Sequence, residues 1–168
     1  DTGAGRVSPK RALGTPVLFQ MPAVKVTKRY APVSVHHPKV GMWVFDFGDN
    51  MAGFAKLSLP KNAFVEGSRI FLKYGEVLKD DGTVNMAFCV PPCNCSSINC
   101  ANQTDTYIPP RKNASDRFTY TPTFTYHGFR YVQLENVAPA YIPVASDLVG
   151  MFVHTDVNRA GHVFFPKK

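Results

Sequence analysis

Short stretches in which apolar and polar residues alternate recur along the chain, and they predict β-strands. Residues 68–75 alternate most cleanly, and residues 42–47 and 54–59 form two further β-rich runs. Gly-Asp-Asn at 48–50 and Pro60 are residue types that end strands, so we expect the two β-rich runs to stop there. Three separate strands are therefore expected in this part of the chain.

The same kind of pattern continues through the second half of the chain. Shorter strand-like runs are expected at 106–108, 118–126, 129–134 and 148–154. No window of twelve or more residues has the 3.6-residue apolar repeat of an amphipathic helix. Short strands at intervals of about 8–12 residues, with turn residues between them, are typical of sandwiches and barrels. We therefore predict an all-β fold, an antiparallel β-sandwich.

The first forty residues have a different character. Residues 1–21 show no period, whereas 24–30 and 33–35 alternate and are separated by prolines that suit an edge position. We therefore divide the chain into an extended N-terminal arm, residues 1–40, and a β-sandwich domain, residues 41–168. The apolar arm residues available for pairing are Val17, Phe19, Val24, Val26, Val33 and Val35. Such strands could add to a sheet edge of their own domain or of a neighbouring molecule, and the sequence leaves both alternatives open.

Positive charge is concentrated in this arm. The chain of 168 residues has a formal net charge of +7, and residues 1–40 contribute seven Lys or Arg against one Asp, a net +6. Residues 41–168 carry the remaining +1 and are thus nearly neutral. We interpret the basic arm as a solubilising segment and not as a nucleic-acid surface, since no zinc-finger, RNP or glycine-rich phosphate motif accompanies it. No apolar run approaches about 18 residues. We therefore expect neither a nucleic-acid partner nor a membrane span.

Cysteines and glycosylation sequons cluster between residues 89 and 115. The four cysteines are Cys89, Cys93, Cys95 and Cys100. Their spacing lacks the two separated knuckles of a structural zinc site, so we favour two local disulfides, 89–93 with 95–100 or 89–95 with 93–100. The N-x-S/T sequons stand at Asn94, Asn102 and Asn113. Together these residues predict a secreted, extracellular glycoprotein that carries N-glycans.

The segment GMWVFDFGDNMAG at residues 41–53 resembles the opening of the β-sandwich domain of α-L-rhamnosidases, in which a DFGQNMAG-type segment recurs. Similar pieces follow in the same order, KYGEVL at 73–78, TDTY at 104–107 and FTYHGFRY at 124–131. The likeness extends over about residues 20–165. It implies a jelly-roll or concanavalin-like sandwich, which in that family is the non-catalytic domain that leads into an (α/α)-barrel.

The resemblance also implies that this chain lacks the catalytic part of such an enzyme. The family's catalytic carboxylates lie in the barrel, in an acidic segment of the type DERxGWxxD, and no such segment occurs here. The carboxylates that remain as candidates are Asp46, Asp49, Glu76 and Asp105. Each stands beside a turn and a strand, where bonding to turn amides is the favoured role. Calcium at Asp46, Asp49 and Asn50 is the alternative, but we predict no enzyme activity, no catalytic residue, no metal and no other cofactor.

Two functions fit a non-catalytic domain of this kind. In the first, the domain is a structural subunit that self-associates through its arm, as a homo-oligomer or a filament. In the second, it is a carbohydrate-binding module or an accessory domain of an α-L-rhamnosidase-like protein, with glycans as partners. The aromatic residues that could form a sugar platform are Trp43, Tyr107, Tyr120 and Tyr126. Alternating aromatics in a sandwich more commonly pack in the core.

Overall fold

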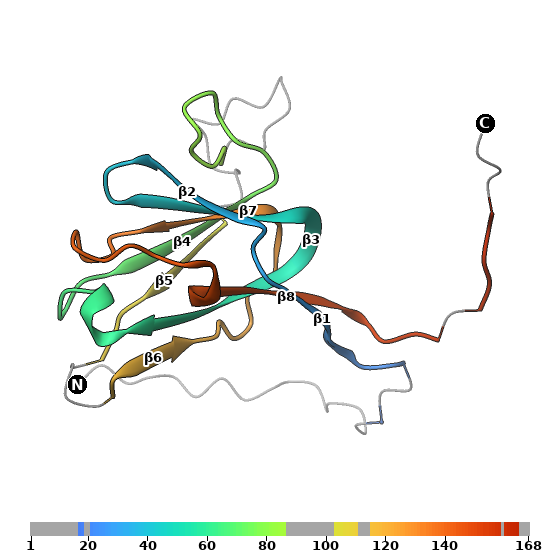
Figure 1. The fold of residues 1–168 in the computed structure, drawn as a ribbon. Helices are drawn as coiled ribbons and strands as arrows, with labels where there is room; N and C mark the ends of the chain where they lie inside the picture. The colour runs from blue at the N-terminus through green and yellow to red at the C-terminus, as the bar shows by residue number, and fades with distance from the viewer. Residues whose placement is uncertain (1–16, 19–20, 87–102, 111–114, 159, 165–168) are drawn as a thin grey trace, which may run out of the picture.

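The structure, a computed structural model, is built almost entirely of β-strands (Figure 1). It describes residues 17–18, 21–86, 103–110, 115–158 and 160–164. The strands are β1 (Val24–Tyr30), β2 (Ser34–Lys39), β3 (Met42–Pro60), β4 (Ile70–Gly75), β5 (Thr104–Tyr107), β6 (Arg117–Tyr120), β7 (His127–Glu135) and β8 (Leu148–Thr155). Among the described residues, the short 3₁₀ helix η1 (Lys61–Ala63) follows β3, and a second one, η3 (Ala145–Asp147), precedes β8. No helix in these ranges is long and apolar enough to cross a membrane.

The strands form one antiparallel sheet that curls on itself (Figure 1). Along its main path the order is β1-β8-β3-β7-β4-β5, and β2 and β6 also pair with β3. One half, β2-β3-β7-β4-β5, faces the other half, β1-β8-β3-β6, and the two make the layers of a sandwich. The predicted all-β, antiparallel sandwich is confirmed.

Strand β3 belongs to both layers. Its first residues pair with β2 and β7, and its last residues pair with β8 and β6. The prediction that a strand ends at residues 48–50 is wrong, because the chain bends through a register irregularity between Asp46 and Met51 and continues to Pro60. Gly48, at φ +80°, supplies the left-handed backbone that this bend requires, and its N–H donates to Asp46 Oδ1 at 2.7 Å.

Gly53 marks the position at which β3 leaves β7 for β8. Its Cα partners are His127 on β7 and Phe152 on β8. A Cβ at this position would lie 1.9 Å from the carbonyl oxygen of Met151, a separation that no side chain tolerates. The glycine that ends the 41–53 segment is therefore required by the close approach of two backbones.

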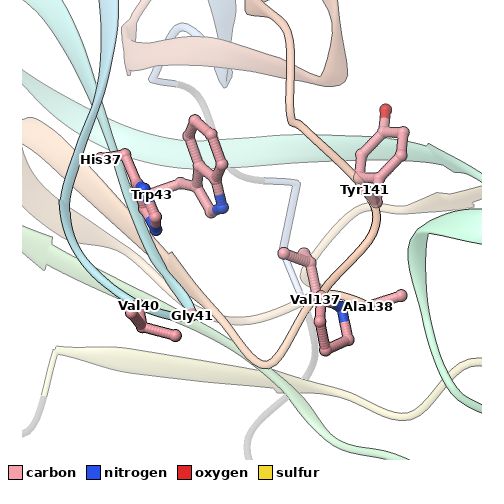
Figure 2. Close-up of a pocket in the computed structure, with 8 residues that line it drawn as sticks. His37, Val40, Gly41, Trp43, Val137, Ala138 and Tyr141 are labelled. Atoms are coloured by element: carbon pink, nitrogen blue, oxygen red, sulfur yellow. The ribbon is translucent and has the colours of Figure 1, made fainter.

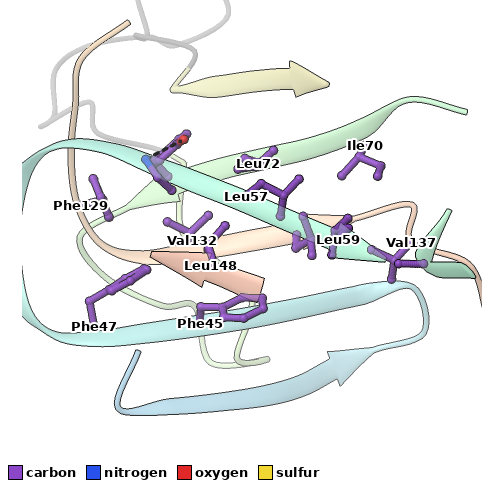
Figure 3. Packing of buried hydrophobic residues seen from close by; sticks show 14 of the residues in the cluster. Phe45, Phe47, Leu57, Leu59, Ile70, Leu72, Phe129, Val132, Val137 and Leu148 are labelled. Atoms are coloured by element: carbon purple, nitrogen blue, oxygen red, sulfur yellow. Dashed lines mark hydrogen bonds between the residues drawn. The ribbon is translucent and has the colours of Figure 1, made fainter. Parts of the chain in front are cut away.

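The core lies between the two layers, where apolar side chains of β3, β4, β7 and β8 pack together (Figure 3). Its most deeply buried members include Phe45, Leu57, Leu72, Phe129, Val132 and Leu148. Successive residues of a strand point to opposite faces, so every second residue of the alternating runs reaches this core. The alternation visible in the sequence is thus the pattern of a two-layer fold.

The strand-like pieces of the predicted arm pair within the chain. β1, which contains Val24 and Val26, pairs with β8, and β2, which contains Val35, pairs with β3. Val33 precedes β2, and its backbone N–H donates to the carbonyl oxygen of Asp46 at 2.7 Å. The division at residue 40 stays a prediction, but two strands of the sheet lie before it.

Candidate functional site

The four aromatic residues predicted as a sugar platform fall in three places. Trp43, near the start of β3, lines a small pocket. Tyr107 and Tyr120 stack on each other with ring centroids 4.9 Å apart, and both pack against the core. Tyr126 is 59% exposed, and its hydroxyl donates to the carbonyl oxygen of Val153 at 3.1 Å. Because β7 and β4 separate the strand of Trp43 from that of Tyr107, the four rings do not make one surface.

The pocket beside Trp43 lies between the turn that joins β2 to β3 and the segment that follows β7 (Figure 2). Its lining residues are His37, Val40, Gly41, Trp43, Val137, Ala138, Pro139 and Tyr141. Its volume is about 110 Å³, whereas sites for drug-sized ligands enclose about 300–1,000 Å³. The pocket therefore has room for one small ring or side chain and not for an extended ligand.

This pocket combines an apolar wall with an available hydrogen-bond donor. His37 lies flat against Trp43, with ring centroids 4.3 Å apart and planes 14° apart, which fixes the indole. In Figure 2 the indole nitrogen of Trp43 is directed toward the space beside Val137. No residue of the described chain accepts a hydrogen bond from this N–H. The indole donor is thus free for a ligand in the pocket.

Tyr141 contributes to the pocket wall, while its hydroxyl is engaged elsewhere. The hydroxyl donates to Asp147 Oδ2 at 2.6 Å, and burial together with this bond raises the pKa of Tyr141 well above its ordinary value. Asp147 is fully buried and also accepts from the Val144 N–H at 2.9 Å and from the Arg117 guanidinium at 3.0 Å. These bonds hold the segment after β7 in place as one side of the pocket.

The residues that complete this pocket carry no sequence signal of their own. His37 is one of five histidines, and Val137 and Tyr141 stand in a segment without a strand pattern. They meet Trp43 because β3 and β7 pair with Trp43 opposite Leu134, so the chain leaves β7 beside the β2–β3 turn. The pairing of two strands about ninety residues apart assembles the site, and no local pattern predicts it.

A second cluster of polar residues, Tyr74, Asp105 and His127, lies buried in the sandwich. The Tyr74 hydroxyl donates to Asp105 Oδ2 at 2.7 Å, and His127 Nε2 lies 3.2 Å from Asp105 Oδ1. The rings of Tyr74 and His127 stack 4.0 Å apart, and burial raises the pKa of the Tyr74 hydroxyl well above its ordinary value. Asp105, one of the four candidate carboxylates, is thus 4% exposed and bonded through both oxygens, so it serves the core.

The other candidate carboxylates do not line the Trp43 pocket. Asp46 accepts from Arg130 through both oxygens, at 2.8 and 2.9 Å, and this bond holds the pKa of Asp46 below its ordinary value. Glu76 accepts from the Asn50 side chain at 3.1 Å, and Asp49 is exposed. Within the described ranges, no group of three or more His, Cys, Asp and Glu residues is placed to hold a metal ion.

The predicted glycosylation and disulfide residues lie outside the described residues. They are Asn94, Asn102, Asn113, Cys89, Cys93, Cys95 and Cys100. The same holds for Phe19 of the arm, whereas Val17 is described and is 88% exposed. The assignments at all of these positions stay predictions.

Comparison with known proteins relates this chain to α-L-rhamnosidases. The family model described as the bacterial alpha-L-rhamnosidase concanavalin-like domain matches residues 36–154. An alpha-L-rhamnosidase of Streptomyces avermitilis is 33% identical over 132 residues, which make up 79% of this chain and 11% of that protein. The similarity therefore covers most of this chain and a small part of the relative.

Solved structures agree with this relation. The alpha-L-rhamnosidase from Dictyoglumus thermophilum has a TM-score of 0.65 and 33% identity, with 80% of this chain and 13% of that chain covered. The Streptomyces avermitilis alpha-L-rhamnosidase complexed with L-rhamnose has a TM-score of 0.66 and 32% identity, with 81% and 12% covered. This chain thus spans little more than a tenth of these relatives, and the resemblance predicted from its motifs is confirmed. The chain belongs to the family of the bacterial α-L-rhamnosidase concanavalin-like domain.

Proposed function

We propose that this chain acts as a non-catalytic accessory module of an α-L-rhamnosidase-type protein. The observation that carries the proposal is the extent of the match, since the likeness lies in the concanavalin-like domain and takes in only 11–13% of the relatives. The activity in the names of those relatives belongs to the whole proteins. For this chain we infer a supporting role beside such an activity.

The chemistry of the carboxylates supports a role without catalysis. Glycoside hydrolysis requires two carboxyl groups about 5–10 Å apart on either side of a bound sugar. Asp105 is buried against Tyr74 and His127, and Asp46 is paired with Arg130. Both carboxylates are thus committed to bonds that hold the sandwich, and neither lines the Trp43 pocket.

An activity assay with the isolated chain tests this proposal. The folded chain at high concentration is incubated with 4-nitrophenyl α-L-rhamnopyranoside, and release of nitrophenolate is followed. We expect the rate to equal that of buffer alone, with a cooperative thermal transition as the control for folding. Hydrolysis of the nitrophenyl rhamnoside that co-purifies with the chain and is lost in the Glu76→Gln variant would overturn the proposal.

The proposed module travels the secretory route and carries N-glycans. The support is the sequence cluster of three sequons and four cysteines, together with the exposure of Pro110, which precedes the sequon at Asn113, and of Ser115, its third residue. Expression in a eukaryotic secretory host tests it. We expect endoglycosidase treatment to lower the apparent mass, and the variants Asn94→Gln, Asn102→Gln and Asn113→Gln each to remove one glycan. Secretion of an unmodified chain would contradict this part of the proposal.

Self-association through the arm stays a second prediction. β1 and β2 already pair with strands of their own chain, which favours the accessory role over strand donation to a neighbour. The residues before β1 are the part of the arm that is left for contacts between molecules. Removal of residues 1–23 tests the prediction.

A further inference from the structure

We infer that the pocket beside Trp43 binds the terminal 6-deoxyhexose ring of a glycan, such as an α-linked L-rhamnose residue. The ligand class rests on the proposed function, and the site goes beyond it. Trp43, one of the aromatic residues predicted as a sugar platform, lines this pocket. Tyr107 and Tyr120 are stacked against the core instead, and Tyr126 is bonded to β8.

The lining suits a ring that is apolar at one edge and hydroxylated at the other. A 6-deoxyhexose carries a methyl group where a hexose carries a hydroxymethyl group. Val40, Val137 and Pro139 offer this methyl group an apolar wall. Across the pocket, the Trp43 N–H has no acceptor within the described chain, and a sugar hydroxyl supplies one (Figure 2). The indole nitrogen is not one of the buried polar atoms that lack a partner, so solvent reaches this N–H until a sugar hydroxyl takes its place.

Both walls of the pocket are held in place before any ligand arrives. On one side His37 stacks on the indole at 4.3 Å. On the other side Tyr141 is tied to the fully buried Asp147, which also bonds Arg117. Binding therefore orders few side chains, and a small ligand gains from this preorganisation.

The size of the pocket limits the ligand to one residue. A volume of about 110 Å³ lies well below the range of about 300–1,000 Å³ that encloses larger ligands. A glycan therefore enters by its non-reducing end, with a single ring in the pocket and the rest of the chain in solvent.

The only tryptophan of the chain reports on this site directly. Because the sequence contains a single Trp, one indole N–H signal in a ¹H–¹⁵N spectrum and the intrinsic fluorescence both belong to Trp43. The chain is titrated with methyl α-L-rhamnopyranoside and, as the matched ligand, with methyl α-L-mannopyranoside, which differs by one hydroxyl at C6. We expect a saturable shift of the indole signal with the rhamnoside. The L-mannoside should bind about tenfold more weakly, because its extra hydroxyl is buried against the apolar wall.

Variants separate this site from other surfaces. Trp43→Phe keeps a ring and removes the N–H, and we expect about tenfold weaker binding by saturation-transfer NMR. Tyr126→Phe, outside the pocket, should bind as the unaltered chain does. Should Trp43→Phe fail to fold, Val40→Asp places a charge at a position that is 93% exposed, so it keeps the fold and weakens binding.

The outcomes distinguish this inference from the proposed function. Absence of a saturable indole shift, equal binding of both methyl glycosides, or unchanged affinity in a folded Trp43→Phe or Val40→Asp chain would overturn the pocket assignment. Those results leave the accessory role standing, since that role depends on the nitrophenyl rhamnoside assay. Conversely, hydrolysis of the nitrophenyl rhamnoside would remove the accessory role whatever the pocket binds.

Discussion

At the scale of single residues, Asp46 accounts for the bend of β3. One of its oxygens accepts from the Gly48 N–H inside the bend, and both accept from Arg130 on β7. The carboxylate therefore joins the bend to the neighbouring strand. In sequence Asp46 was one of four acidic residues beside turns, and the predicted role of bonding to turn amides matches the contact with Gly48.

Replacement of Asp46 should make the fold less stable and less sensitive to acid. The bond with Arg130 lowers the folded-state pKa of Asp46 below the ordinary value of 3.8. A depressed pKa gives stability that is fully present above the unfolded pKa and is lost as pH falls through the folded pKa. We expect Asp46→Asn to cost about 1–2 kcal/mol at pH 7, measured by urea unfolding. Below pH 4 the difference between the two chains should shrink.

Asp116 provides the matched control for this pH dependence. Its pKa is also lowered, by a hydrogen bond from Lys61, but its side chain is 89% exposed. Exposed pairs contribute little to stability. Asp116→Asn should therefore unfold like the unaltered chain at pH 7. A constant difference between Asp46→Asn and the unaltered chain from pH 7 to pH 2 would show that the carboxylate charge is not what holds the bend.

At the scale of elements, β3 is the strand that makes a curled sheet into a sandwich. It pairs with β2 and β7 in one layer and with β8 and β6 in the other. Two devices allow this change of layer, the bend at Gly48 and the close approach at Gly53. Both glycines belong to the 41–53 segment, so the family motif encodes the corner of the sandwich.

Substitution of Gly53 should disrupt that corner. In Gly53→Ala the new Cβ would meet the carbonyl oxygen of Met151 at 1.9 Å, and the backbones of β3 and β8 would have to separate. We expect a loss of about 3 kcal/mol or more in the free energy of unfolding, measured by chemical denaturation.

A second glycine serves as the control for the Gly53 experiment. A Cβ at Gly161 has no atom within 4 Å, and its φ is not in the left-handed region. Gly161→Ala should unfold at the same denaturant concentration as the unaltered chain. Equal stabilities of Gly53→Ala and Gly161→Ala would mean that β3 and β8 do not approach as closely as described.

At the scale of the whole molecule, the N-terminal segment is part of the sandwich from residue 24 onward. β1 pairs with one edge of β8, and β2 pairs with one edge of β3 (Figure 1). The positive charge of residues 1–40 therefore belongs partly to the sheet, with Lys25 paired to Asp156 at 2.6 Å. Charge and prolines carry no information about strand partners, so they do not predict that β1 and β2 pair with β8 and β3.

Two truncations should separate the contributions of this segment. Removal of residues 1–23 leaves every described strand, so we expect a cooperative thermal transition close to that of the full chain. Removal of residues 1–40 deletes β1 and β2 and leaves edges of β8 and β3 without partners, so cooperative unfolding should be lost. Calorimetry distinguishes the two outcomes, and a folded chain lacking residues 1–40 would contradict the strand pairing.

The shorter truncation also tests self-association through the arm. If residues before β1 connect molecules, their removal lowers the particle size measured by light scattering and electron microscopy. An unchanged particle size after removal of residues 1–23 would remove the filament prediction. The accessory role does not depend on this result.

The sequence by itself determined the class of fold and the family of this protein. Alternation is a local property, because neighbouring residues of a strand face opposite sides, and it therefore identified the strands of 68–75 and 129–134 without knowledge of their partners. The ordered motifs from 41–53 to 124–131 identified the family in the same way. The local role of Asp46, bonding to a turn amide, was likewise predicted from its neighbours along the chain.

Only the tertiary structure decided that β3 runs through residues 48–50 and that His37, Trp43 and Tyr141 line one pocket. The residue types at 48–50 are compatible both with a bend inside one strand and with a turn between two strands. Which of the two forms depends on the strands that pair with each half of β3. The pocket likewise depends on the pairing of β3 with β7. Strand partners are chosen by burial of side chains that are distant in sequence, and no local pattern contains that information.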